Sequence, residues 1–126
     1  MIQKWIRDEL EKEIPNLEWT RDFKTGKDHT GVVYNEAPGN PSKDDFDLLY
    51  PTYSIYIETS NLDQAEFMAW KVHEKMNKRR QEIAVVDGGI TFDIIFIHAV
   101  PPFLVGITNK KATYSINLET TIRRIL

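Results

Sequence analysis

Several segments of this chain alternate apolar and polar residues, as β-strands do. Single helical segments separate groups of these strand-like segments. The clearest one is "TYSIYIET" at 52–59, where Tyr53, Ile55 and Ile57 point to one side. Further segments that read as strands are listed by position: 17–23, 31–37, 90–100, 103–110 and 111–126. Consecutive strands with few helices between them pair through turns, whereas parallel strands need long crossovers. We therefore expect an α+β fold with a mostly antiparallel β-sheet.

Two amphipathic segments are expected to be helices that pack on one face of this sheet. The first runs from Ile2 to about Ile14, because Pro15 disfavours a helical conformation in the residue before it. The second follows Ser60, which stands three residues before Asp63 in a variant of the capping box. It ends in cations that complement the negative end of the helix dipole, namely Lys75, Lys78, Arg79 and Arg80.

Turn residues predict how the strands connect. Residues 17–37 are expected to form a hairpin around Gly26, and "DGG" at 87–89 a turn before the strand at 90–100. Alternation in that strand places Phe96 and His98 on the face of Ile94. The apolar phase of the elements predicts these core residues: Trp5, Leu10, Ile55, Ile57, Val72, Ile94, Phe96, Ile116 and Leu118.

Length and composition exclude several classes of protein. A chain of 126 residues fits one domain, 1–126, that can bury a core of its own. The net charge of -3 offers no basic field for nucleic acid or an anionic membrane, and no apolar run approaches the roughly 20 residues that span a bilayer. With no cysteine, the chain has no disulfide and no thiolate zinc site, which fits a reducing compartment. The charged opening segment is not that of a signal peptide.

Signals for catalysis or metal binding are incomplete. His73 opens "HEKMN", but Asn77 occupies the position of the second histidine of a zinc peptidase. Asp45 and Asp47 alternate as calcium ligands do, but no glycine or closing glutamate follows them. We therefore expect no catalytic residue, no metal and no cofactor. The alternative is a small metal-dependent enzyme that uses the acidic loop and His29.

The loop from Ala37 to Tyr50 combines aspartates with apolar residues. Its length of about 14 residues is one at which loops tend to have a function or to be disordered. Apolar anchors rimmed by charge are typical of protein interfaces, although the pattern fits packing within the domain equally well. The interface candidates of the loop and of the apolar C-terminus are Phe46, Leu48, Leu49, Tyr50, Ile125 and Leu126.

The whole chain resembles the short minor capsid proteins of siphophages that infect Gram-positive bacteria. The resemblance rests on "IQKWIRDEL", "TRDFKTGKDHTGVVYNEAPG", "YSIYIETSNLDQAEFMAWKVHEKM" and the closing run of strands. In size and architecture the chain also resembles the tail terminator proteins of long-tailed phages. In that group an α/β protomer forms a hexameric ring that caps the tail tube and offers a surface to the head.

This resemblance implies a structural protein and not an enzyme. Its partners would be further copies of itself in a ring of six, the tail tube protein and a head-completion or connector protein. DNA would only pass through the lumen, and Asp44, Asp45 and Asp47 would line that lumen or an end face. The location would be the head–tail junction of the virion, after assembly in the host cytoplasm. The alternative within the same particle is a head-completion or connector protein.

Overall fold

The computed structural model describes residues 1–38 and 47–125. The elements of these residues, in chain order, are α1 (Gln3–Glu13), β1 (Glu18–Arg21), β2 (Thr30–Ala37), β3 (Leu48–Leu49), β4 (Thr52–Thr59), α2 (Leu62–Met76), β5 (Glu82–Val85), the 3-10 helix η1 (Asp87–Gly89), β6 (Thr91–Ala99), β7 (Phe103–Thr108) and β8 (Lys111–Ile125). None of the helices in these two ranges is long and apolar enough to cross a membrane.

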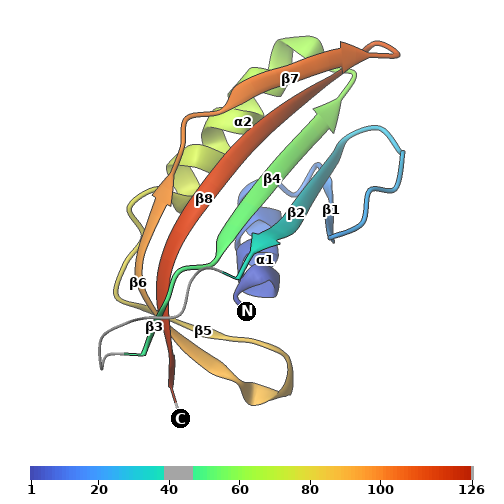
Figure 1. The fold of residues 1–126 in the computed structure, drawn as a ribbon. Helices are drawn as coiled ribbons and strands as arrows, with labels where there is room; N and C mark the ends of the chain where they lie inside the picture. The colour runs from blue at the N-terminus through green and yellow to red at the C-terminus, as the bar shows by residue number, and fades with distance from the viewer. Residues whose placement is uncertain (39–46, 126) are drawn as a thin grey trace.

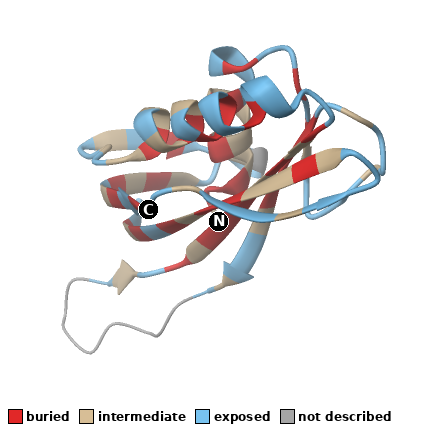
Figure 2. Ribbon diagram, turned by 90° about the horizontal axis from the view of Figure 1, so that it is seen from above, coloured by how far each residue is buried: buried red, intermediate tan, exposed pale blue. Residues whose placement is uncertain are grey.

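The strands form one curled sheet with both α-helices on one face (Figure 1). The strand order is β1-β2-β4-β8-β6-β5, and β3 and β7 also pair with β8. Among the described strands, β1 and β2 are parallel and the other pairs are antiparallel. The view from above shows buried residues concentrated between the helices and the sheet (Figure 2). The expected α+β fold, with a mostly antiparallel sheet and two helices on one face, is confirmed.

The core lies between the helices and the central strands β4 and β8. In this pair Ile55 stands opposite Ile116 and Tyr53 opposite Leu118, so their side chains meet on the same face. These predicted core residues are buried: Leu10, Ile55, Ile57, Val72, Ile94, Ile116 and Leu118. Two further predictions, Trp5 and Phe96, are wrong in degree, because both side chains are only half-buried.

A β-bulge in β6 explains the position of Phe96. The pairing of β6 with β8 shifts between Ile94 and Phe96, so Ile95 is an extra residue and the alternation changes phase there. After the bulge Ile97 is buried, whereas His98 is exposed. The predicted face for Phe96 and His98 is therefore wrong, since an unbroken alternation does not allow for the extra residue.

The predicted hairpin at 17–37 is also wrong, because β1 and β2 run parallel. Trp19 stands opposite Gly31, whose missing side chain leaves room for the indole; an added Cβ would lie 2.5 Å from the ring. The indole Nε1 donates to the carbonyl oxygen of Ile14 at 2.9 Å, which ties β1 to the end of α1. The loop between the strands returns the chain to the start of β2 through left-handed residues at Asp22 and His29.

Ser60 does not cap α2 as the sequence predicts. The residue before the helix is Asn61, and no side chain caps the helix there. The backbone N–H and the hydroxyl of Ser60 instead both donate to the carboxylate of Asp28. Hydrogen bonds from Ser60 and the backbone N–H of His29 hold the pKa of that exposed carboxyl below its ordinary value. The contact pins the loop between β1 and β2 to the start of α2.

Candidate assembly surfaces

Strand β7 is apolar and exposed. The exposed fraction is 51% for Phe103, 46% for Leu104, 53% for Val105 and 57% for Ile107. Leu104 and Ile107 pair with residues of β8 that face the helices, so these two side chains lie on the helix side of the sheet. An edge strand with bare apolar side chains is prone to pair with another chain. The sequence analysis missed this surface, although "FLVGIT" offers few polar residues for a solvated side.

The adjacent flank of α2 extends this apolar area. Lys75 forms an ion pair with Glu13 of α1 at 4.0 Å, so its flank of α2 faces α1. Leu62 and Trp70 lie on the opposite flank, each about 140° around the helix from Lys75. Both are exposed, and the Trp70 ring meets that of His73 edge-on. We call the combined set the β7-edge surface: Leu62, Trp70, Leu104 and Ile107 on the helix side, and Phe103 and Val105 on the helix-free side of the same edge strand.

A second apolar area lies at the other end of β8, where the structure brings together several predicted interface residues. Leu48 and Leu49 pair with Arg123 and Ile122 of β8, close to Ile125. Tyr50 and Ile125 are exposed, whereas Leu49 packs against the core. Asp47, one of the predicted lumen or end-face residues, is exposed just before β3. The remaining candidates lie outside the described residues: Phe46, Leu126, Asp44 and Asp45.

The hairpin of β5 and β6 completes this second area, which the sequence analysis did not predict as a strand pair. Ile94 and Ile122 face the core, so their neighbours Asp93 and Arg123 face the helix-free side of the sheet. Ile83 pairs with Asp93 and therefore shares that side. The same alternation places Leu48, Ile83, Val85 and Ile125 on this side, and we call these four residues the arm surface. The arm itself is the hairpin of β5 and β6 together with β3 and the end of β8, and it extends below the helices (Figure 1).

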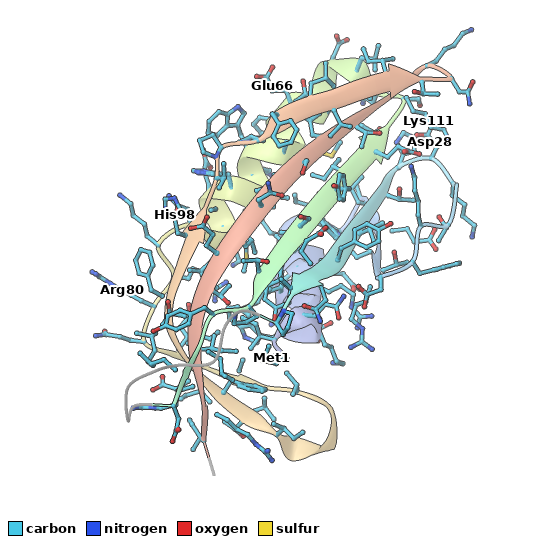
Figure 3. All side chains as sticks on the ribbon, in the orientation of Figure 1. Met1, Asp28, Glu66, Arg80, His98 and Lys111 are labelled. Carbon is cyan, nitrogen blue, oxygen red and sulfur yellow. The ribbon has the colours of Figure 1, made fainter. Side chains whose placement is uncertain are left out.

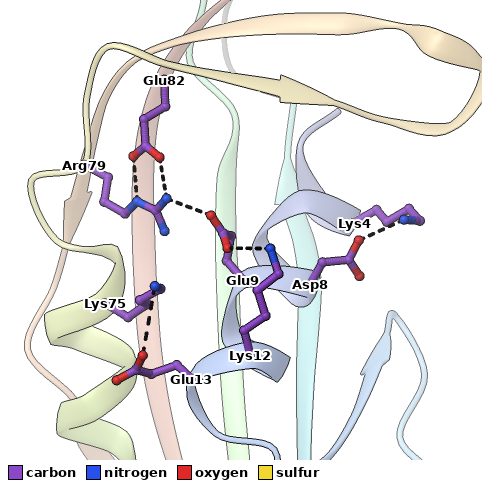
Figure 4. Close-up of polar contacts among 8 residues, drawn as sticks. All are labelled: Lys4, Asp8, Glu9, Lys12, Glu13, Lys75, Arg79 and Glu82. Carbon is purple, nitrogen blue, oxygen red and sulfur yellow. Dashed lines mark hydrogen bonds and ion pairs between the residues drawn. The ribbon is translucent and has the colours of Figure 1, made fainter.

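Arg79 holds the arm against the helices (Figure 4). Its guanidinium donates to Glu9 of α1 at 2.8 Å and to both carboxylate oxygens of Glu82 in β5. Its charge also lies over the Trp5 ring, 4.7 Å from the centroid. The hydrogen bonds that it donates to Glu82 and Glu9 raise the pKa of Arg79 against the effect of burial. Contacts from one cation to α1 and β5 fix the direction in which the arm leaves the domain.

The helix-free face of the sheet carries a groove of about 530 Å³. Tyr34 of β2 and Tyr56 of β4 meet there edge to face, with ring centroids 5.5 Å apart. Glu58 is neutralised by Lys24 at 2.7 Å and accepts a hydrogen bond from Thr113. Glu36 also lines the groove, so two carboxylates border it, and that of Glu58 is held by Lys24 and Thr113.

The histidines of the chain are spread over different elements. His29 contacts the hydroxyl of Thr59 through Nδ1 at 2.7 Å, His73 packs on Trp70, and His98 is exposed on β6. Figure 3 shows His98 and Asp28, the neighbour of His29, toward opposite edges of the sheet. In residues 1–38 and 47–125 no group of three or more histidine, aspartate or glutamate side chains could hold a metal ion. Asn77 has another role, since its side-chain oxygen accepts from the backbone N–H of Ala99.

No protein-family model and no curated protein matches the chain. Among solved structures, one protein whose name carries no functional information superposes with a TM-score of 0.61. The match covers 98% of this chain and 92% of the other, at 13% sequence identity. At that identity the likeness concerns the fold alone.

Proposed function

We propose that this chain is a structural protein of a bacteriophage particle, a tail terminator that forms a ring on the tail tube and joins it to the head. The observation that carries the proposal is the β7-edge surface. It places four large apolar side chains of one edge strand in solvent, each about half exposed or more. An edge strand with exposed apolar side chains on both faces of the sheet is prone to pair with another chain.

A ring subunit needs separate contact surfaces for its neighbours, and this chain has two. The strands that carry the β7-edge surface and the arm surface pair with opposite ends of β8, which is 15 residues long. A contact repeated around a ring is multiplied by the number of subunits, so each interface can be small. The resemblance of the sequence to siphophage minor capsid and tail terminator proteins supports the same assignment, with six subunits.

The remaining surfaces suit the partners of such a ring. Loops on a rigid sheet can contact the tail tube protein on one side and a head-completion or connector protein on the other. Asp47 precedes the arm and is exposed, and acidic side chains repel DNA that passes through a lumen. The ring would lie at the head–tail junction of the virion, after assembly in the host cytoplasm.

The experiment replaces Leu104 and Ile107 together by aspartate in the phage that encodes the chain. Both side chains are exposed, so the variant should fold, while its ring should fail to form. We expect separated heads and tails, counted by electron microscopy, in place of joined particles. Phe23→Asp is the matched control, because Phe23 is 63% exposed on the loop between β1 and β2. Joined particles at normal yield from a folded Leu104→Asp/Ile107→Asp chain would refute the proposal.

A further inference from the structure

We infer that neighbouring subunits contact each other head to tail, with the β7-edge surface of one copy on the arm surface of the next. This inference rests on the proposed function and names the two halves of the subunit contact. The first argument is position: β7 pairs with the start of β8, at 111–115, whereas the arm surface surrounds the end of β8, at 122–125. Figure 1 shows β7 and the arm at opposite ends of the molecule.

The helix-side part of the β7-edge surface and the arm surface also face opposite sides of the sheet. Leu104 and Ile107 lie on the helix side together with the flank of α2. Ile83 and Val85 lie on the helix-free side, with exposed fractions of 55% and 62%. A symmetric pair would join one of these surfaces to its own copy and leave the other bare. A head-to-tail contact covers both at once, and it is the kind of contact from which a closed ring is built.

Charges around the surfaces are complementary. On α2, Asp63 and Glu66 are exposed beside Leu62, and Figure 3 shows Glu66 on the part of α2 behind β7. On the arm, Arg123 lies between the apolar residues, 3.2 Å from Asp93, with 45% of its side chain exposed. Acidic residues beside Leu62 and an arginine among the apolar residues of the arm favour contact between these unlike surfaces.

The absence of cysteine from the chain allows a direct test. Leu104→Cys marks the β7-edge surface and Val85→Cys marks the arm surface. The two variants are treated with a flexible bismaleimide, alone and as an equal mixture, at the highest concentration at which the full chain stays soluble. We expect about tenfold more cross-linked dimer from the mixture than from either variant alone, because the complex holds unlike thiols at a high effective concentration. Glu11→Cys, exposed on α1, replaces Leu104→Cys in the control mixture and should give only background.

Each other outcome is informative. A dimer from Leu104→Cys alone would show a symmetric contact and overturn the inference, while self-association through β7 would survive. Equal, background cross-linking in every mixture would overturn the contact between these two surfaces. The particle experiment with Leu104→Asp/Ile107→Asp tests the proposed function separately. A charge test sharpens the result: Glu66→Arg in the Leu104→Cys chain should lower the yield of the cross-linked mixture several-fold.

Discussion

Strands β4 and β7 are both antiparallel neighbours of β8 over residues 112–115, yet one is buried and the other is exposed. On the helix side Ile55 and Ile57 of β4 have no exposed surface, whereas Leu104 and Ile107 of β7 are 46% and 57% exposed. Both strands are apolar and both are hydrogen-bonded to the same partner. The two strands differ in what covers them: the helices and β2 enclose β4, whereas β7 lies at the edge of the sheet. Pairing and apolar sequence therefore do not suffice for burial, and β7 keeps an apolar surface in solvent.

The largest expected effect on stability comes from shortening a buried side chain of β4. Ile55→Ala should lower the free energy of unfolding by about 2–5 kcal/mol, because the fully buried side chain leaves a cavity that its neighbours cannot fill. Urea denaturation followed by fluorescence measures the change. A loss below about 1 kcal/mol would mean that β4 is not enclosed as described.

The next effect concerns the contact that holds α1 against the arm. Arg79→Met should cost about 2 kcal/mol, since it leaves the carboxylates of Glu9 and Glu82 partly buried without their cation. Burial acts to raise the pKa of Glu9, but the hydrogen bond and charge of Arg79 outweigh it and hold this pKa below its ordinary value. The interaction is therefore complete above about pH 4.5 and is lost as the pH falls further.

The measurement for Arg79 compares unfolding free energies at neutral and acid pH. The gap between wild type and Arg79→Met should begin to shrink as the pH falls below about 4.5, and should close only below the lowered pKa that Glu9 has in the folded wild type. Arg80→Met, at an exposed neighbouring position, should change stability by less than about 0.5 kcal/mol. A gap that stays constant down to acid pH would contradict the role given to Glu9.

A smaller effect is expected from the bond that ties β4 to the start of α1. The Tyr53 hydroxyl accepts from the backbone N–H of Ile2 at 3.1 Å, and Tyr53→Phe should cost about 1 kcal/mol. Burial raises the pKa of Tyr53 to about 12, so the folded chain keeps the phenol neutral while the unfolded chain ionises from about pH 10. Wild type should therefore lose stability between these pH values.

Alkaline denaturation checks the assignment of Tyr53. Tyr53→Phe should lose less stability than wild type between about pH 10 and pH 12. Tyr34→Phe, on the helix-free face, is the matched variant and should keep the loss. If Tyr34→Phe instead removes it, the alkaline transition belongs to another part of the molecule.

The smallest effect on stability is expected at β7. Ile107→Ser should change the unfolding free energy by less than about 0.5 kcal/mol, because more than half of the side chain is already in water. The same substitution should weaken self-association, measured by analytical ultracentrifugation. A loss of stability comparable to that of Ile55→Ala would remove the distinction between the two strands.

The sequence predicts the fold class, the helices and most of the core, because these follow from repeating patterns. It fails where one residue changes the pattern. The bulge at Ile95 reverses the alternation for Phe96 and His98, and no turn residue announces it. The parallel pairing of β1 depends on Trp19 over Gly31, a contact between strands that spacing alone does not reveal.

The candidate surfaces were predictable in part. Apolar residues in the polar loop indicated Leu48, Leu49 and Tyr50, and the end of the chain indicated Ile125; the register of β3 then joins these regions. The β7-edge surface was not predicted, because "FLVGIT" reads equally well as a buried strand. Only the position of β7 at the edge, beyond the cover of α2, distinguishes the two cases. Burial is a property of neighbours, which a local pattern does not contain.

The length of β8 has a mechanical consequence. Its 15 residues, at about 3.3 Å each, make one continuous strand of roughly 50 Å that links β7 at one end with the arm at the other. A force transmitted from one neighbouring subunit to the next would run along this strand, parallel to its ladders with β4 and β6. Such a load shears many hydrogen bonds together and does not peel them one by one. In the proposed ring, this strand would carry tension from one subunit contact to the other.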